Sequence, residues 1–216
     1  MFYSFNVGLG SDFYALWTYY LTSPFNLPAL LVPERFLMEY VTVIGAVRFG
    51  LCGLSAYIYF ERRIGEDGGA GLLFSMFYAF SGFMLAYYYN IMWIDCVIIF
   101  PLLILSLERL VKEGKGMLYC MLLALSIFCN FYLSIMICLF LVLYFIMLLV
   151  TERCSLKTIL DFVIYSVLAA GLCGVILIPQ VLYLKDTSFG NSSFPQDVRF
   201  YFDIFDELIR DRKSTR

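Results

Sequence analysis

Two charged side chains interrupt apolar stretches of this sequence, and they carry most of its chemical information. Arg48 lies inside the apolar run 40–60, and Asp95 lies near the start of the run 91–107. An arginine at the centre of a membrane helix costs about 2.5–3.5 kcal/mol on an insertion scale, so it needs a partner or a polar cavity. We expect Asp95 to lie within reach of Arg48, because both are close to the same end of their segments.

Each of the two residues has a functional and a structural interpretation. Arg48 could face a water-filled cavity and hold a phosphate or pyrophosphate, or pair with a carboxylate on a neighbouring helix; both interpretations are open. Asp95 could act as a general base, a metal ligand or a group that recognises sugar hydroxyls. Its structural alternative is a carboxylate stabilised by a helix N-terminus, and we favour the functional interpretation.

Five further residues are weaker candidates. Asn90 and Tyr132 mark two turns at the same predicted face, and Trp93 is typical of an anchor at a membrane interface. Asn130 could line the cavity of Arg48, but we favour a role in satisfying the backbone of a broken helix. Asp12 could act on a substrate as a second catalytic carboxylate, although capping of a helix from Phe13 is favoured.

The composition restricts the class of protein. Of 216 residues, 62% are hydrophobic and 15% are charged, and the mean hydropathy is +0.84. These values are too apolar for a soluble domain and exclude intrinsic disorder. The net charge of −2 gives no indication of a nucleic-acid partner. Histidine is absent, which excludes Ser-His-Asp catalysis and histidine metal sites.

The seven cysteines form no C-x-x-C motif, and we interpret them as small apolar residues of helices. No metal ligands are therefore predicted from the sequence. A divalent metal nevertheless stays open as a cofactor.

The apolar runs predict an all-α, polytopic integral membrane bundle that occupies residues 38–184. A spanning helix needs about 20 apolar residues. The stretch 116–150 would measure roughly 52 Å as one helix, so we expect it to turn near Asn130 and cross twice. The six predicted segments are 40–60, 70–89, 91–107, 117–129, 133–150 and 159–184.

Basic residues set the predicted orientation. Arg62, Arg109 and Arg153 lie in alternate connections, and the connections at Asn90 and Asn130 carry no Lys or Arg. The basic connections are therefore expected in the cytoplasm. This places outside the cell the stretch 1–37, with an interfacial aromatic helix, and the amphipathic tail 185–216. The stretch 1–37 contains no apolar span that could export it, and the tail ends without a closing element, so we expect a fragment truncated at both ends.

Several motifs resemble the bacterial YfhO family. The most specific block reads SGFM…YNIMWID…FPLL…LERL, and the resemblance extends from Ser4 to about Leu184. The family resembles GT-C glycosyltransferases, which transfer sugar from a polyprenyl-phosphate donor. The resemblance implies a GT-C-like fold in the bacterial cytoplasmic membrane and an acceptor on the outer face, a cell-envelope polymer such as lipoteichoic acid.

The resemblance also implies a missing part of the site. Family members begin with a transmembrane helix whose outer end carries an acidic residue, and this helix is absent here. Asp12 is not a clear substitute, because it lies in the following G-x-G loop. The fragment alone is therefore expected to be inactive.

The leading hypothesis is a lipid-linked sugar transferase in contact with the bilayer, the donor and the envelope acceptor. Asp95 and Asp12 would be catalytic, since a carboxylate deprotonates the acceptor hydroxyl in such chemistry. The substrate-binding candidates are Arg48, Asn130, Asn90, Trp93 and Tyr132. The alternatives are a transporter or flippase for a lipid-linked substrate and a non-catalytic membrane scaffold.

Overall fold

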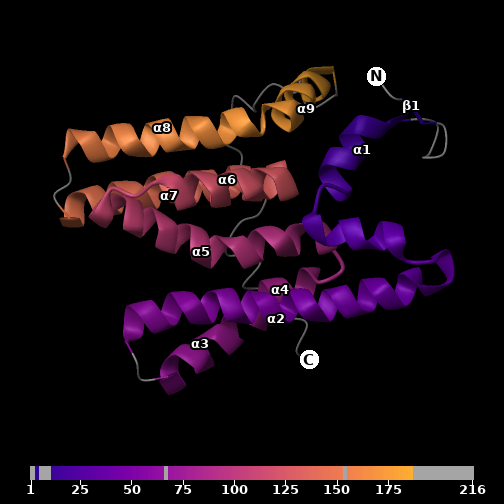
Figure 1. Cartoon of the computed structure of the whole chain (residues 1–216), viewed down its shortest axis with the longest axis horizontal. Helices are drawn as coiled ribbons and strands as arrows, with labels where there is room; N and C mark the ends of the chain where they lie inside the picture. Colours follow the sequence, from indigo (N-terminus) through magenta and orange to yellow (C-terminus); the bar gives the residue numbers. More distant parts are fainter. Residues whose placement is uncertain (1–2, 5–10, 66–67, 153–154, 187–216) are drawn as a thin grey trace, which may run out of the picture. The chain divides into compact units, whose positions relative to one another are not determined.

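The computed structural model describes residues 3–4, 11–65, 68–152 and 155–186 (Figure 1). The chain divides into two compact units between residues 181 and 182. The second unit is described only for residues 182–186, so most of the predicted tail lies outside the described residues. A short antiparallel ladder pairs β1 (Tyr3–Ser4) with β2 (Ser11–Asp12). The helices are α1 (Phe13–Tyr20), η1 (Pro24–Leu31), η2 (Glu34–Phe36), α2 (Leu37–Ile64), α3 (Gly68–Ala79), α4 (Gly82–Tyr87), α5 (Ile91–Glu113), α6 (Met117–Cys129), α7 (Phe131–Glu152), α8 (Leu156–Leu172) and α9 (Gly174–Asp186).

The helices confirm the predicted all-α, multi-pass membrane fold. Among the described residues, four stretches are long and apolar enough to cross a bilayer: Glu34–Ile64, Gly69–Tyr87, Ile91–Glu113 and Phe131–Glu152. A fifth crossing is possible where Leu156–Leu172 meets Gly174–Leu182 at a 74° bend. Helix α6 has only 13 residues, or roughly 20 Å, and is shorter than a hydrocarbon core.

Two predicted segments are interrupted in the structure. The run 70–89 is divided into α3 and α4, and the Ser81 hydroxyl accepts a hydrogen bond from the backbone N–H of Met84 at the start of α4. The run 159–184 is bent between α8 and α9 rather than forming one straight helix. Both breaks leave helix-end backbone groups that need partners, because lipid offers none.

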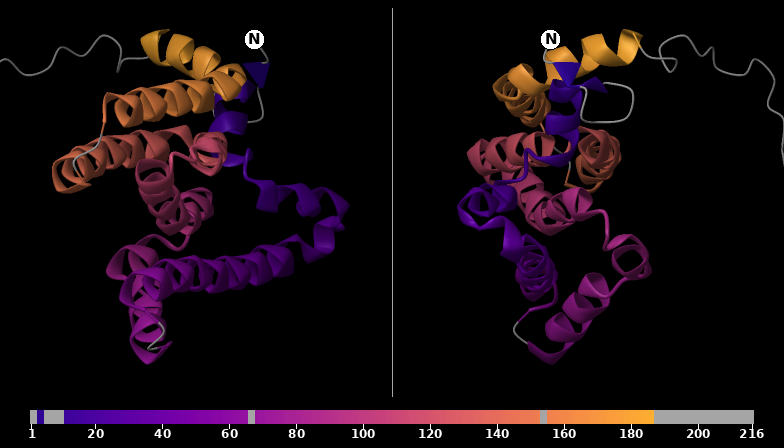
Figure 2. Two further views of the ribbon diagram at one scale, coloured as in Figure 1. Left: turned by 60° about the vertical axis from the view of Figure 1, so that its left-hand side comes forward. Right: turned by 90° about the vertical axis from the view of Figure 1, so that its right-hand side faces the viewer.

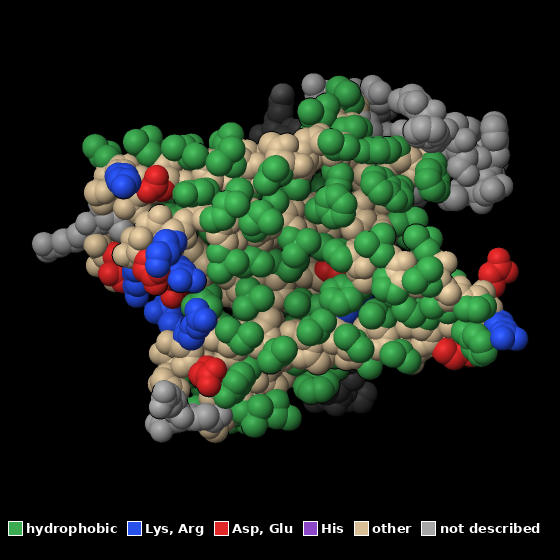
Figure 3. Space-filling view, in the orientation of Figure 1, with side chains coloured by type: hydrophobic (Ala, Val, Ile, Leu, Met, Phe, Trp, Pro, Cys, Tyr) green, Lys and Arg blue, Asp and Glu red, His purple; other side chains and the backbone are tan. Residues whose placement is uncertain are grey.

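Helices α2, α5 and α7 run parallel to one another. Their C-terminal ends meet through Arg63, Glu108 and Tyr144, and Lys112 reaches Glu152 of α7. We name this the charged end; in Figure 3 most of the visible Lys, Arg, Asp and Glu side chains gather there, a few lie at the opposite side, and most of the visible face is hydrophobic. The opposite end, where α6 stops and α7 starts, is named the Asn130 end.

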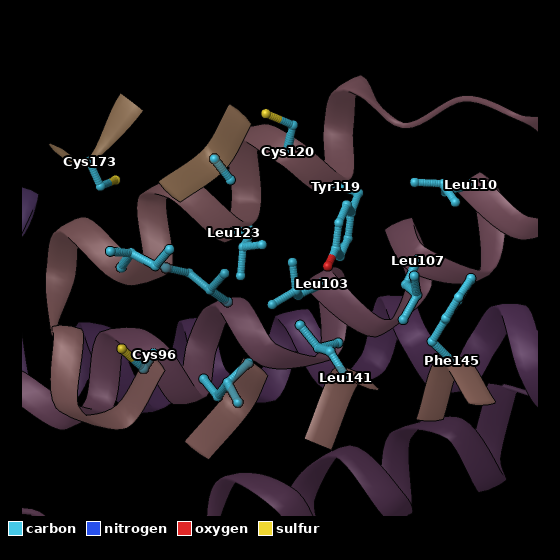
Figure 4. Close-up of a cluster of buried hydrophobic side chains, with 14 of the residues drawn as sticks. Cys96, Leu103, Leu107, Leu110, Tyr119, Cys120, Leu123, Leu141, Phe145 and Cys173 are labelled. Atoms are coloured by element: carbon cyan, nitrogen blue, oxygen red, sulfur yellow. The ribbon is translucent and has the colours of Figure 1, made fainter. Parts of the chain in front are cut away.

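The main core lies among α5, α6, α7 and α8. Figure 4 shows its buried side chains, among them Leu103 and Leu107 of α5, Leu123 of α6 and Leu141 of α7. The views in Figure 2 agree that α6, α7 and α8 lie side by side, as their contacts require. A smaller cluster of Cys52, Met84 and Ile94 holds α2 against α4 and α5.

Candidate functional site

Arg48 of α2 and Asp95 of α5 form a buried ion pair. The Arg48 Nε atom lies 2.9 Å from Asp95 Oδ1, and Nη2 lies 3.5 Å from Oδ2. The two side chains are 0% and 1% exposed. The predicted proximity of these two residues is confirmed, whereas their chemical roles stay predictions.

The segment that joins α1 to η1 folds over this ion pair. Ser23 Oγ accepts a hydrogen bond from Arg48 Nη2 at 3.0 Å, and Asn26 Oδ1 accepts a longer one at 3.5 Å. The Phe25 ring centroid lies 5.2 Å from the Arg48 guanidinium carbon. Tyr40 OH donates to the Phe25 carbonyl oxygen at 2.5 Å and ties the same segment to α2. The polar environment of Arg48 therefore comes from α2, α5 and the segment 23–26.

Sequence reasoning missed Ser23 and Asn26. The Ser23-Pro24 pair does indicate a chain break, and Ser23 caps η1 by accepting from the Phe25 N–H. A break signal does not say how deep in the fold the segment lies. Only the buried charge at Arg48, which requires polar partners, offered a hint that some loop must reach it.

The ion pair is incompletely satisfied. In the part of the chain that is described, Arg48 Nη1 has no hydrogen-bond partner, and the Nε and Oδ1 atoms are in contact as ions without hydrogen-bond alignment. A buried donor without a partner costs about 1–3 kcal/mol, and more when it is charged. Arg48 Nη1 is therefore a free cationic donor inside the site.

The structure also brings together candidates at the Asn130 end. Trp93 Nε1 donates to Tyr19 OH at 3.3 Å, and the rings of Trp93 and Tyr132 are stacked with centroids 6.4 Å apart. Asn130 Nδ2 donates to the Tyr19 carbonyl oxygen at 3.4 Å. Helix α1 therefore packs on the turn between α6 and α7.

Asn130 has the backbone role that we favoured from the sequence. Its Oδ1 accepts a hydrogen bond from the Leu133 N–H at 2.9 Å in the first turn of α7. Its carbonyl oxygen accepts a weak bond from the Cys96 thiol at 3.8 Å. Because Cys96 follows Asp95 directly, this contact links the Asn130 turn to the ion pair.

The remaining candidates are less involved. Asn90 is the N-cap residue of α5 but makes no side-chain capping hydrogen bond. The side chain of Asp12 lies outside the described part of the structure, so its predicted catalytic role stays a prediction. Among the described residues, no group of three or more Asp, Glu or Cys side chains could hold a metal ion.

A second acidic side chain is nearly buried at the charged end, and the sequence did not single it out. Glu108 Oε1 lies 2.9 Å from Arg63 Nη2 and accepts a hydrogen bond from Tyr144 OH at 2.5 Å. In sequence Glu108 precedes Arg109 at the end of an apolar run, which is typical of a solvated helix end. Its burial depends on Tyr144, which is 36 residues away.

The family model described as bacterial membrane protein YfhO matches residues 1–211. No curated protein and no solved structure matches the chain.

Proposed function

The chain belongs to the YfhO family of bacterial membrane proteins, and from this premise we propose that it carries part of the site of a membrane glycosyltransferase. The donor is a polyprenyl-phosphate sugar and the acceptor is a cell-envelope polymer resembling lipoteichoic acid. The observation that carries the proposal is the buried Arg48–Asp95 pair with its free Arg48 Nη1 donor.

The energetics of buried ion pairs support a chemical role. Apolar side chains of similar volume usually hold two helices together as well as a buried ion pair does, and often better by about 1–4 kcal/mol. An ion pair whose only role was to join α2 to α5 would therefore stabilise the two helices less well than apolar side chains could. An arginine and a carboxylate instead suit transfer from a phosphate donor, because one can bind the phosphate and the other can accept a proton.

Each side chain has a distinct part in the proposed reaction. Asp95 accepts the proton of the acceptor hydroxyl as the sugar is transferred. Arg48 donates Nη1 to the donor phosphate and stabilises the negative charge that develops as the sugar–phosphate bond breaks. Asn90, Trp93 and Tyr132 are the proposed contacts for sugar and acceptor, whereas the Asn130 amide, which is bonded to Leu133 and Tyr19, would hold the turn beside them.

The depth of the pair and the charge distribution support the outer face as the place of reaction. Arg48 lies eight residues after Tyr40, which is about 12 Å along α2 from the start of the predicted apolar run. The opposite, charged end contains Arg63, Arg109 and Lys112. Basic residues of this kind favour the cytoplasm, so the Asn130 end faces outward in this proposal.

Removal of the Asp95 charge tests the proposal. Membranes that contain the full-length protein are supplied with radiolabelled polyprenyl-phosphate glucose, galactose or N-acetylglucosamine, and sugar incorporation into polymer is measured. Asp95→Asn should lower transfer by about 100-fold or more at an unchanged protein level, as expected for loss of a general base. Glu108→Gln is the matched control, because it removes a nearly buried acid from the same helix. Normal transfer in Asp95→Asn would refute the assignment.

A further inference from the structure

The buried ion pair is closed to a substrate in this structure. Arg48 and Asp95 are 0% and 1% exposed, and Ser23, which is hydrogen-bonded to Arg48, is 1% exposed. The guanidinium is also contacted by the Asn26 side chain and by the Phe25 ring. A phosphate can therefore reach Arg48 only when part of this surrounding moves away.

Segment 23–26 already occupies one of the two positions that a phosphate would take on Arg48. A phosphate binds an arginine most strongly through two oxygens, each of which accepts from a different N–H group of the guanidinium. Arg48 Nη1 has no partner among the described residues, whereas Nη2 donates to Ser23 Oγ at 3.0 Å and to Asn26 Oδ1 at 3.5 Å. A phosphate bound through both nitrogens therefore has to displace Ser23 and Asn26 from Nη2.

The chain on one side of this segment is firmly held, and the chain on the other side is not. In α1, the Tyr14 hydroxyl donates to the Val175 carbonyl oxygen at 2.5 Å, and just after α1 the Thr22 hydroxyl donates to the Cys129 carbonyl oxygen at 3.2 Å. By contrast, no residue of η1 or η2 is buried. Segments with few buried contacts open at a low cost in free energy. The part that can leave Arg48 therefore runs from Ser23 into η1, while α1 stays in place.

One hydrogen bond holds the segment against α2 without involving the ion pair. The Tyr40 hydroxyl donates to the Phe25 carbonyl oxygen at 2.5 Å, and this side chain has no hydrogen bond to Arg48 or Asp95 in the described structure. The bond stabilises the closed arrangement only, because it breaks when segment 23–26 moves away from α2.

We propose that segment 23–26 is a lid, which closes the site when it is empty and which the phosphate of the lipid-linked donor displaces from Arg48. The inference rests on the proposed function and adds how its site opens. In the closed state, Ser23 and Asn26 satisfy Nη2 and leave Nη1 without a partner. In the open state, two phosphate oxygens satisfy both nitrogens. The donor therefore selects the open state, and the site stays closed to water when no donor is bound.

Tyr40→Phe tests the lid through its effect on binding. A lid that is mostly closed weakens the apparent affinity by the fraction of protein that is open, so loss of one closed-state hydrogen bond should lower the apparent Kd for polyprenyl phosphate about fivefold. Thr42→Val is the control, because the exposed Thr42 hydroxyl bonds only to the Met38 carbonyl oxygen of α2 in the described structure, and it should leave the Kd unchanged. Binding of radiolabelled polyprenyl phosphate to the full-length protein in nanodiscs is measured. A Kd that is unchanged or higher in Tyr40→Phe would overturn the inference, since a hydroxyl with a purely structural role predicts that result.

Hydrogen exchange of the same protein, followed by mass spectrometry, reports the movement itself. The Phe25 and Asn26 amides bond to Ser23 Oγ and to the Ser23 carbonyl oxygen in the covered turn. Polyprenyl phosphate should speed exchange in peptides that contain residues 23–31, because this turn moves into water, whereas polyprenol without phosphate and phosphatidylglycerol should not. Unchanged exchange with polyprenyl phosphate bound, or the same increase with phosphatidylglycerol, would overturn the inference. Opening by polyprenyl phosphate in a protein that transfers no sugar would keep the lid and refute the proposed function instead.

Discussion

Helices α2 and α5 are joined by two ion pairs that differ in their access to solvent. Arg48–Asp95 is 0% and 1% exposed, whereas Arg63–Glu108 is 42% and 9% exposed, and both have N–O distances of 2.9 Å. The partners are 15 residues apart on α2 and 13 residues apart on α5, or about 22 and 20 Å. The same two helices are therefore joined by the same kind of ion pair twice, once in a buried environment and once near solvent.

In the proposed function, this difference separates a structural ion pair from one that takes part in chemistry. At the charged end, Tyr144 hydrogen-bonds Glu108 and the exposed guanidinium of Arg63 reaches the surface. At the buried pair, Arg48 Nη1 has no partner among the described residues, and the segment 23–26 covers the guanidinium. The contacts among Arg63, Glu108 and Tyr144 are fully explained by a structural role, since they hold α2 against α5 and α7. The buried pair leaves a charge that a substrate phosphate would satisfy.

The largest effect on stability is expected when the buried pair is broken from one side. Asp95→Leu leaves the Arg48 charge buried and unpaired, which should cost about 3–5 kcal/mol of unfolding free energy. SDS titration of the protein in mixed micelles measures this change. Glu108→Leu should cost clearly less, because Arg63 can turn to water. Equal losses in the two variants would mean that solvent access does not distinguish the pairs.

Loss of the Ser23 hydroxyl should have the next largest effect. Ser23→Ala removes the 3.0 Å acceptor of Arg48 Nη2, and hydrogen bonds to charged groups are worth about 1.5–3 kcal/mol. Ser55→Ala is the control, because this buried serine on α2 bonds only to the Cys52 carbonyl oxygen in the described structure. The rate at which a thiol-reactive dye labels the buried cysteines on heating reports the change. Identical melting curves for the two variants would show that segment 23–26 does not support Arg48.

Tyr144→Phe tests the charged end with a smaller expected change. The variant keeps the ring and removes the hydroxyl that donates to Glu108, so about 0.5–1.5 kcal/mol should be lost. Sugar transfer should be unchanged, because Tyr144 lies at the opposite end from the proposed site. A loss of sugar transfer at a normal protein level would show that the charged end takes part in the reaction, and would contradict its purely structural role.

The smallest effect is expected at an exposed pair of the same end. The Lys112 Nζ and Glu152 Oε1 atoms are 3.5 Å apart, and both side chains are a little under half exposed. Pairs of this kind contribute little, so Lys112→Ala should not change the unfolding midpoint measurably. The same measurement in high salt should also leave the wild type unchanged. A clear loss in either case would indicate a network of charges rather than isolated pairs.

The sequence predicted those features that depend on the chain's own apolar pattern. The helices follow apolar runs, the break at Asn130 follows from a run too long for one crossing, and Arg48 near Asp95 follows from the cost of a lone buried charge. The rotation of one helix against another leaves no such local signal. Ser23 at the ion pair and Tyr144 over Glu108 depend on that rotation, and so both escaped prediction.

The double variant Arg48→Met/Asp95→Leu tests the central claim most directly. It replaces the ion pair by apolar side chains, which should keep the fold at wild-type stability or above. The two substitutions are made in the full-length protein, which is reconstituted in lipid vesicles with radiolabelled polyprenyl-phosphate sugars and isolated lipoteichoic acid, and incorporation is measured beside the wild type. We predict a folded protein without sugar transfer. A folded double variant that transfers sugar at the wild-type rate would show that the pair only fastens two helices.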